Sequence, residues 1–308
     1  MRVVFAGTPD VALPPLEALA TSDHEVVGIV TRPDAPVGRK RVLTASPVAV
    51  RGEELGLPVL KPAHPRDPDF QARLRALEPD VVAVVAYGAL VPDDALAIPE
   101  HGWVNLHFSV LPAWRGAAPV QHALLHGDEV TGATTFRIVK ELDAGPTFGV
   151  MTQLVRPDDT AGTLLDTLAE GGAGLLVATL DGLADGSVWP QEQPTDGVSL
   201  APKITAADAR VDWTEPAPWV SRRIRATTPA PGAWTTLGGE RMKLGPVTLV
   251  PGAPALAPGE VIATRAGVHV GTGTDPVTLG EVTPPGRRAM AAVDWARGAD
   301  LPDGTRLD

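Results

Sequence analysis

The chain has 308 residues, a formal net charge of −11, 44% hydrophobic residues and no cysteine. This length predicts two domains, because a single core rarely grows beyond about 250 to 300 residues. The lack of cysteine excludes a disulfide framework, a thiolate metal site and a cysteine nucleophile. We identify no signal segment and no apolar run near the roughly 20 residues of a membrane span, so we expect a cytoplasmic protein with no membrane partner.

Strands and helices alternate along the first 186 residues. Apolar segments rich in β-branched residues predict strands at residues 1–7, 25–31, 59–60 and 80–88. Helical spacing of apolar residues predicts helices at 13–19, 46–56, 67–77, 121–126 and 161–183. This alternation is typical of βαβ units, so it predicts an α/β fold with a mainly parallel sheet.

The composition changes after Gly186. Residues 187–205 combine prolines with polar residues and lack either period, which indicates an interdomain linker. Residues 206–308 contain one helical stretch, Ala217 to Ala226, and several short apolar runs separated by glycine and proline. Such punctuation predicts a small antiparallel barrel or sandwich.

The acidic net charge argues against a nucleic-acid partner, for which a basic surface is expected. The charge is uneven, however, because residues 206–308 hold 11 basic and 11 acidic residues. In the acidic first part, the loop from Asp34 to Pro47 contains the basic run Arg39, Lys40 and Arg41. Basic clusters are usually solvated surface, but a basic loop is also suited to binding phosphates.

The most informative pattern is VNLHF at residues 104–108 together with the turn ELDAGP that contains Asp143. In a strand, Asn105 and His107 lie on the same face. An Asn amide can donate to a developing oxyanion, and His titrates near neutral pH and can accept a proton. A carboxylate such as Asp143 can fix the imidazole tautomer and favour its protonated form. These groups suit acyl transfer to an amine, although ordinary packing and turn formation remain an alternative.

The segment NLHFSVLPAWRGAAP resembles the pattern N-x-H-x-S-L-L-P-x-x-R-G-x-x-P of the formyltransferases that use 10-formyltetrahydrofolate. The resemblance implies that Asn105, His107 and Asp143 form the catalytic set. It also implies a folate site at Ser109, Val110, Leu111 and Pro112. The resemblance implies that the enzyme uses no metal. Val110 stands where the family usually has leucine, which is a small apolar exchange.

The resemblance extends along nearly the whole chain, to the members of this family that formylate methionyl-tRNA. It is carried by MRVVFAGTPD, TRPDAPVGRKRVLTASPVAV, VVAVVAYGALVP and ARVDWTEPAPWVSRRIRATTPAPGAW. It implies a Rossmann-like formyltransferase domain at 1–186, a linker at 187–205, and a smaller β-barrel of the oligonucleotide-binding type at 206–308. The implied partner is initiator methionyl-tRNA, whose acceptor end would contact Arg39, Lys40 and Arg41.

Two other functions remain open from the sequence. A formyltransferase for a sugar nucleotide or a purine precursor would share the folate motif, but the basic loop and the C-terminal segment argue against it. A catalytically silent nucleic-acid-binding relative is disfavoured by the intact Asn105, His107 and Asp143. His122 and His126 have the spacing of helical metal ligands, but Ala123 follows the first, so we expect no metal site. We expect a monomer.

Overall fold

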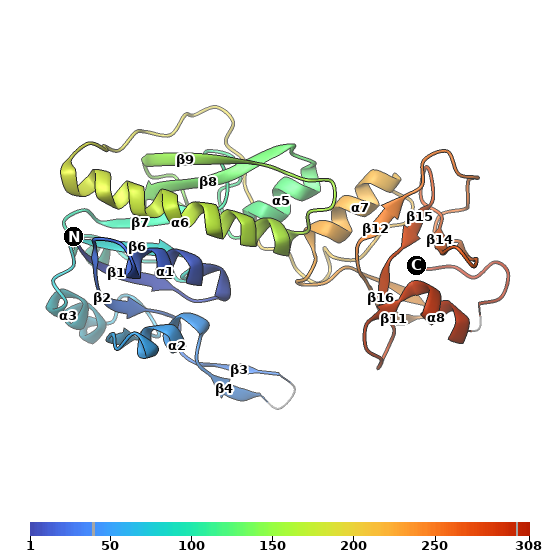
Figure 1. Ribbon diagram of the computed structural model, residues 1–308, viewed down its shortest axis with the longest axis horizontal. Helices are drawn as coiled ribbons and strands as arrows, with labels where there is room; N and C mark the ends of the chain where they lie inside the picture. The colour runs from blue at the N-terminus through green and yellow to red at the C-terminus, as the bar shows by residue number, and fades with distance from the viewer. Residues whose placement is uncertain (39–40, 300) are drawn as a thin grey trace. The chain divides into compact units, whose positions relative to one another are not determined.

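The structure is a computed structural model that describes residues 1–38, 41–299 and 301–308. The chain forms two compact units (Figure 1). The first unit comprises residues 1–116, 130–153 and 165–200, and the second comprises 117–129, 154–164 and 201–308.

The first unit is built around a seven-stranded sheet with the order β5-β2-β1-β6-β7-β8-β9. Its strands are Arg2–Gly7 (β1), Glu25–Val30 (β2), Val59–Leu60 (β5), Val81–Val85 (β6), Trp103–His107 (β7), Val130–Arg137 (β8) and Thr147–Leu154 (β9). The pairs from β5 through β7 are parallel, and β8 runs antiparallel to β7. The predicted mainly parallel sheet is therefore confirmed, whereas β8 and β9 were not predicted from the sequence.

The helices around this sheet are Leu13–Ala20 (α1), Pro47–Glu54 (α2), Pro68–Ala76 (α3), Asp93–Leu96 (α4) and Ala161–Asp185 (α6), with a 3-10 turn at Asp10–Ala12. Side-chain caps begin two of these helices, α2 and α3. Ser46 caps α2, because its side chain accepts a hydrogen bond from the Ala49 amide at 3.0 Å. Asp67 caps α3 in the same way. A proline follows each cap, at the position where its missing N–H costs nothing.

Helix α6, drawn in yellow-green in Figure 1, packs along β7 and β8. A Cβ on Gly172 would lie 2.9 Å from the Leu106 side chain, so glycine permits this close approach. The hydroxyls of Thr135 and Thr179 lie 2.8 Å apart at the same interface. Within the described residues, α6 alone is long and apolar enough to cross a membrane. Its burial is typical of a core helix, as shown by Leu168, Leu176 and Leu180.

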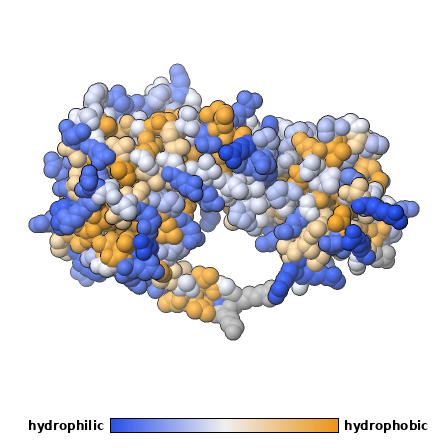
Figure 2. Space-filling view, in the orientation of Figure 1, coloured by the Kyte–Doolittle hydropathy of each residue, from blue (hydrophilic) through white to orange (hydrophobic). Residues whose placement is uncertain are grey.

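The basic loop predicted at Asp34 to Pro47 contains a small hairpin, whose strands are Ala35–Val37 (β3) and Val42–Thr44 (β4). All six strand residues are exposed, and Figure 2 shows hydrophobic atoms on this hairpin. Arg39 and Lys40 lie outside the described residues. Arg41 is exposed and left-handed, with a φ of 50°, and its amide donates to the Gly38 carbonyl at 3.1 Å.

The second unit contains two four-stranded sheets, with the orders β10-β11-β16-β17 and β12-β15-β14-β13. All strand pairs in them are antiparallel, which confirms the predicted antiparallel C-terminal region. The strands are Trp234–Leu237 (β10), Glu240–Leu244 (β11), Val247–Leu249 (β12), Val261–Ala263 (β13), Val268–Val270 (β14), Val277–Leu279 (β15), Glu281–Thr283 (β16) and Met290–Ala291 (β17). The helices are Pro119–His126 (α5), Ala217–Ala226 (α7) and Ala292–Gly298 (α8). Its buried core includes Trp213, Val220, Ile224, Met242, Val270 and Trp295.

Candidate active site

Strand β7 presents two chemically different faces. Leu106 points toward α6, as its approach to Gly172 shows. Asn105 and His107 therefore lie on the opposite face, where they pair across the sheet with Phe136 and Thr134 of β8. Asn105 is half-buried, and within the described part of the chain its side chain has no hydrogen-bond partner. Its amide is thus available to a substrate.

His107 is held between a backbone carbonyl and a carboxylate. Its Nε2 lies 2.9 Å from the Trp114 carbonyl oxygen, and its Nδ1 lies 3.7 Å from Oδ2 of Asp143. Because a carbonyl oxygen only accepts hydrogen bonds, Nε2 carries a hydrogen and donates it to Trp114. In the neutral ring, Nδ1 is then the nitrogen that accepts a proton, and it faces Asp143.

The surroundings of His107 keep the imidazole neutral at neutral pH. The side chain is only 6% exposed, and this burial lowers its pKa below the ordinary value of 6.5. The charge of Asp143 and the hydrogen bond to the Trp114 carbonyl both act in the opposite direction and raise the pKa. Phe136 supplies part of the apolar surroundings, with its ring edge-on to the imidazole at a centroid distance of 6.3 Å. A neutral imidazole is the form that accepts a proton.

Asp143 lies in the loop of residues 138–146 that connects β8 and β9. Its backbone is left-handed, with a φ of 47°, and Oδ2 accepts a hydrogen bond from the Gly116 amide at 2.7 Å. Two residues later, a Cβ on Gly145 would overlap the carbonyl oxygen of Arg137, so only glycine fits this position. The loop therefore directs the Asp143 carboxylate toward His107 through a specific backbone path. The structure brings the three predicted catalytic residues together.

The four predicted folate residues form a turn directly after β7. The Ser109 hydroxyl donates to the Ala113 carbonyl at 2.6 Å, and the Leu111 amide donates to the Thr134 hydroxyl at 3.1 Å. Ser109 and Leu111 are buried, whereas Val110 and Pro112 are half-buried. Ser109 and Leu111 thus shape the turn, and Val110 and Pro112 present surface to a ligand. Thr134, which also donates to the Ser109 carbonyl at 2.7 Å, was not identified from the sequence.

Two further residues beside the site come from the segment predicted as a linker. Gln193 donates to the carbonyl oxygens of Asp143 and Gly145 at 2.8 and 2.7 Å. Ser199 accepts a hydrogen bond from the Trp114 amide at 2.9 Å. The sequence held no signal for either residue, because a glutamine and a serine among prolines and polar residues are typical of any exposed connection.

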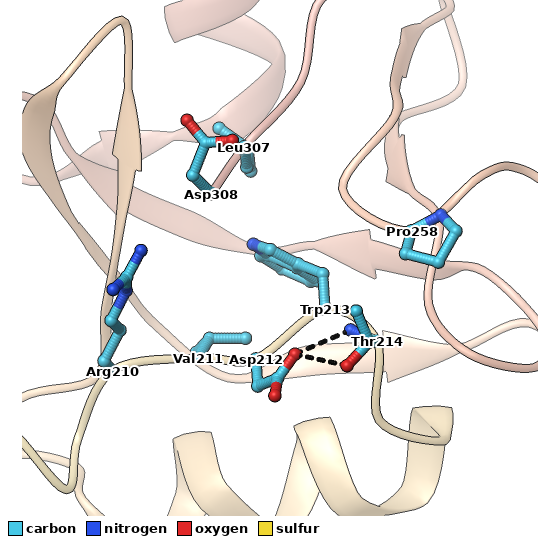
Figure 3. Close-up of a pocket in the computed structure, with 8 residues that line it drawn as sticks. All are labelled: Arg210, Val211, Asp212, Trp213, Thr214, Pro258, Leu307 and Asp308. Carbon is cyan, nitrogen blue, oxygen red and sulfur yellow. Dashed lines mark hydrogen bonds between the residues drawn. The ribbon is translucent and has the colours of Figure 1, made fainter.

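The second unit contains a separate hollow of about 440 Å³ (Figure 3). Its lining includes Arg210, Asp212, Trp213 and Asp308, and it shares no residue with the predicted site. Asp212 already accepts hydrogen bonds from the amide and hydroxyl of Thr214, at 2.9 and 2.6 Å. Within the described residues, no group of three or more His, Cys, Asp or Glu side chains is arranged to hold a metal ion.

Comparison with protein families identifies two matching regions. Residues 1–180 match the formyl transferase model, and residues 203–300 match the model of the formyl transferase C-terminal domain. The chain belongs to the formyl transferase family. This result confirms the family predicted from the segment NLHFSVLPAWRGAAP.

Curated relatives within the formyl transferase family narrow the assignment. A methionyl-tRNA formyltransferase from a Nocardioides species is 67% identical, with 100% of this chain and 98% of the relative covered. A protein of the same name from Salinispora arenicola is 62% identical, with 100% of both chains covered. These relatives confirm the predicted subgroup of methionyl-tRNA formyltransferases.

Solved structures support the same fold at low sequence identity. A methionyl-tRNA formyltransferase from Clostridium thermocellum matches with a TM-score of 0.57 and 13% identity, covering 82% of this chain and 95% of that chain. HypX from Aquifex aeolicus, in complex with tetrahydrofolic acid, matches with a TM-score of 0.69 and 18% identity, covering 96% of this chain and 46% of that chain. At such identities, the likeness shows the formyl transferase fold and nothing finer.

Proposed function

We propose that this protein transfers the formyl group of 10-formyltetrahydrofolate to the α-amino group of methionyl-initiator tRNA. The bond between the formyl carbon and N10 breaks, so the products are N-formylmethionyl-tRNA, which serves translation initiation, and tetrahydrofolate, whose N10 takes up the proton that the amine loses. The observation that carries the proposal is the unpartnered Asn105 amide on the same strand face as a buried His107 backed by Asp143. The acceptor is supported by the names of the relatives that match this chain from end to end.

Asn105 acts as the oxyanion donor. Its amide hydrogens are free to bind the formyl oxygen, where negative charge develops as the amine attacks. The half-buried position limits competition by water while leaving the amide accessible. Donors of this kind contribute about 10²- to 10³-fold to turnover in other acyl-transfer enzymes.

His107 and Asp143 handle the proton that the attacking amine loses. The proton arrives at Nδ1 of His107, because Nε2 is already engaged with the Trp114 carbonyl. The resulting imidazolium faces Asp143 across 3.7 Å and is stabilised by its carboxylate.

The donor and the acceptor would contact different parts of the chain. We assign contacts with the folate to Val110 and Pro112, with Ser109 and Leu111 holding their turn. When bound, 10-formyltetrahydrofolate supplies the activated formyl group, and no metal is required. We assign tRNA contacts to the basic run from Arg39 to Arg41, of which Arg41 is exposed on the hairpin.

The organisation of the chain follows from these assignments. We propose a catalytic domain at residues 1–186, a connection at 187–205 and a tRNA-binding domain at 206–308. We further propose that the protein acts as a cytoplasmic monomer on initiator methionyl-tRNA.

One assay tests the proposed function. The purified protein is incubated with 10-formyltetrahydrofolate and, separately, with methionyl-initiator tRNA, methionyl-elongator tRNA, an amino-sugar nucleotide or glycinamide ribonucleotide. We expect formyl transfer to the initiator tRNA and far less to the other three. Transfer only to a small-molecule amine would contradict the proposed acceptor. No transfer to any of the four would instead favour a silent nucleic-acid-binding relative.

A further inference from the structure

Residues 191–200 are fastened beside the candidate active site at both ends. Near the first end, Gln191 and Thr147 exchange backbone hydrogen bonds of 2.8 and 2.7 Å. Near the second end, the Arg115 amide donates to the Ser199 carbonyl at 2.9 Å. Thr147 directly follows the Asp143 loop, and Arg115 follows the turn that holds His107 through Trp114. The segment therefore joins the two loops on which the catalytic geometry depends.

We infer that Gln193 is a positioning residue that fixes the Asp143 carboxylate for proton transfer. Its Nε2 donates to the carbonyl oxygens of Asp143 and Gly145 at 2.8 and 2.7 Å. Its Oε1 accepts from Nε and Nη2 of Arg115, at 3.1 and 2.6 Å. One side chain thus ties the Asp143 loop to Arg115, next to the Gly116 amide that binds the carboxylate itself.

The chemistry of these contacts requires an amide at position 193. A guanidinium only donates, so Arg115 determines which end of the amide carries the oxygen. The NH2 group must then face the two carbonyl oxygens, which only accept. A carboxylate would place oxygen against oxygen at this point, and an alkyl side chain would satisfy neither partner. Glutamine is therefore matched to both sides of the contact.

The Asp143 loop has a particular need for such support. Asp143 is held in the left-handed region, at a φ of 47°, which costs free energy for residues with a side chain, although less for Asp than for most, so its surroundings must hold it there. Gln193 contacts the carbonyl oxygens on both sides of Ala144, immediately after the strained residue. If this contact is lost, the loop relaxes and the carboxylate leaves its position 3.7 Å from His107. The inference rests on the proposed function, because it assigns Asp143 a role in proton transfer.

The first test is the pKa of His107, measured by NMR titration of isotope-labelled histidine in the full-length protein. The His107 signal is assigned by its loss in His107→Gln. Burial lowers this pKa and the Asp143 charge opposes burial, so a displaced carboxylate must lower the pKa further. We expect Gln193→Ala and Gln193→Leu, which remove the contacts without adding charge, to have a lower His107 pKa than wild type, with Glu192→Ala, an exposed neighbour, as the matched control. An unchanged pKa in both Gln193 variants would overturn the inference.

The second test is kinetic, using 10-formyltetrahydrofolate and whichever amine acceptor the wild-type protein formylates. We expect Gln193→Ala to lower kcat by about 10- to 100-fold, because a catalytic group misplaced by about 1 Å has an effect of that size. KM for both substrates should change less than threefold, and the acid limb of the pH profile should move to lower pH. Arg115→Lys retains the positive charge but not the two guanidinium N–H groups that bind Gln193. We expect this variant to lower kcat less than Gln193→Ala does and to move the acid limb of the pH profile in the same direction.

The outcomes separate the inference from the proposed function. If the wild-type protein formylates a different amine, the proposed acceptor is wrong. The role of Gln193 can still be tested, by comparing kcat of the variants and of wild type with that amine. A positioning role would be refuted if Gln193→Ala only weakened binding. This outcome would appear as a raised KM with normal kcat and an unmoved acid limb. The inference would be supported by a Gln193→Ala protein that has the Tm of wild type, a lower His107 pKa, and an acid limb moved to lower pH.

Discussion

Two loops of the first unit were both predicted to carry function, and they are held in opposite ways. The loop of residues 138–146 is fixed by hydrogen bonds to its side chains and backbone, from Gly116 and from Gln193. The hairpin of β3 and β4 is held by its own strand pairing, and all its strand residues are exposed. The difference corresponds to two demands: proton transfer needs fixed distances, whereas contact with a large polymer needs reach and exposed charge.

The first prediction changes the charge of the fixed loop. Asp143→Asn retains the shape of the side chain and can still accept from the Gly116 amide, but it removes the negative charge that faces His107. We expect turnover to fall by about 10²- to 10⁴-fold, the range for acid–base groups, with little change in either KM. Single-turnover formylation measures this effect. A loss of less than tenfold would show that the charge of Asp143 is not required.

The second prediction changes only the path of the fixed loop. Gly145→Ala places a Cβ against the Arg137 carbonyl, so the backbone must move and carry Asp143 with it. We expect about a 10²-fold loss of turnover. Gly174→Ala is the matched control, because Gly174, like Gly145, is not in the left-handed region but has open space around the added Cβ. Equal losses in the two variants would indicate a general effect of replacing a glycine rather than displacement of Asp143.

The third prediction concerns the exposed hairpin. Arg41→Ala should raise KM for methionyl-initiator tRNA by about two- to tenfold and leave KM for the folate and kcat nearly unchanged, because phosphate contacts contribute mainly to affinity. The slope of log affinity against log salt should become shallower by about one. Binding measured at several salt concentrations checks this. An unaltered slope would exclude a phosphate contact at Arg41.

The smallest expected effect is on stability as a function of pH. Burial holds the pKa of His107 in the folded protein below 6.5. Between that lowered pKa and pH 6.5, the unfolded chain therefore binds a proton at His107 and the folded chain does not. The free energy of unfolding must therefore fall as the pH drops through 6.5, by at most about 1.4 kcal/mol per pH unit for this group. His107→Gln should have a shallower dependence in chemical denaturation from pH 7.5 to 5.5. His24, whose pKa burial also lowers, is present in both proteins and cancels in the comparison. Arg41→Ala should retain the wild-type dependence.

The sequence predicted well what depends on local pattern. The alternation around Asn105 and His107 indicated one shared face, and β7 confirms that arrangement. The run at residues 80–88 predicted a strand buried on both faces, and every residue of β6 is buried. The range predicted for α7, Ala217 to Ala226, is the range observed.

What the sequence did not reveal depends on pairing between distant segments. Strand β8 reads VTGATTFR, whose threonines and glycine lack the apolar pattern of a buried strand. They are buried because Thr134 and Thr135 find partners in the turn after β7 and in α6. The role of Gln193 could not be predicted for a similar reason, since its hydrogen-bond partners lie 48 to 78 residues away along the chain. Such contacts exist only once the fold has formed.

The two faces of β7 also connect correct folding with competence for catalysis. A slip of one residue against β6 and β8 would turn the imidazole of His107 toward Gly172, where even a Cβ on the glycine would lie 2.9 Å from Leu106. Leu106 is buried, so an imidazole in its place would be desolvated, and Leu106 would be left facing the substrate. Molecules with a shifted register would therefore be less stable than molecules with the observed register. The register that is most stable is thus also the register that places Asn105 and His107 on the reactive face.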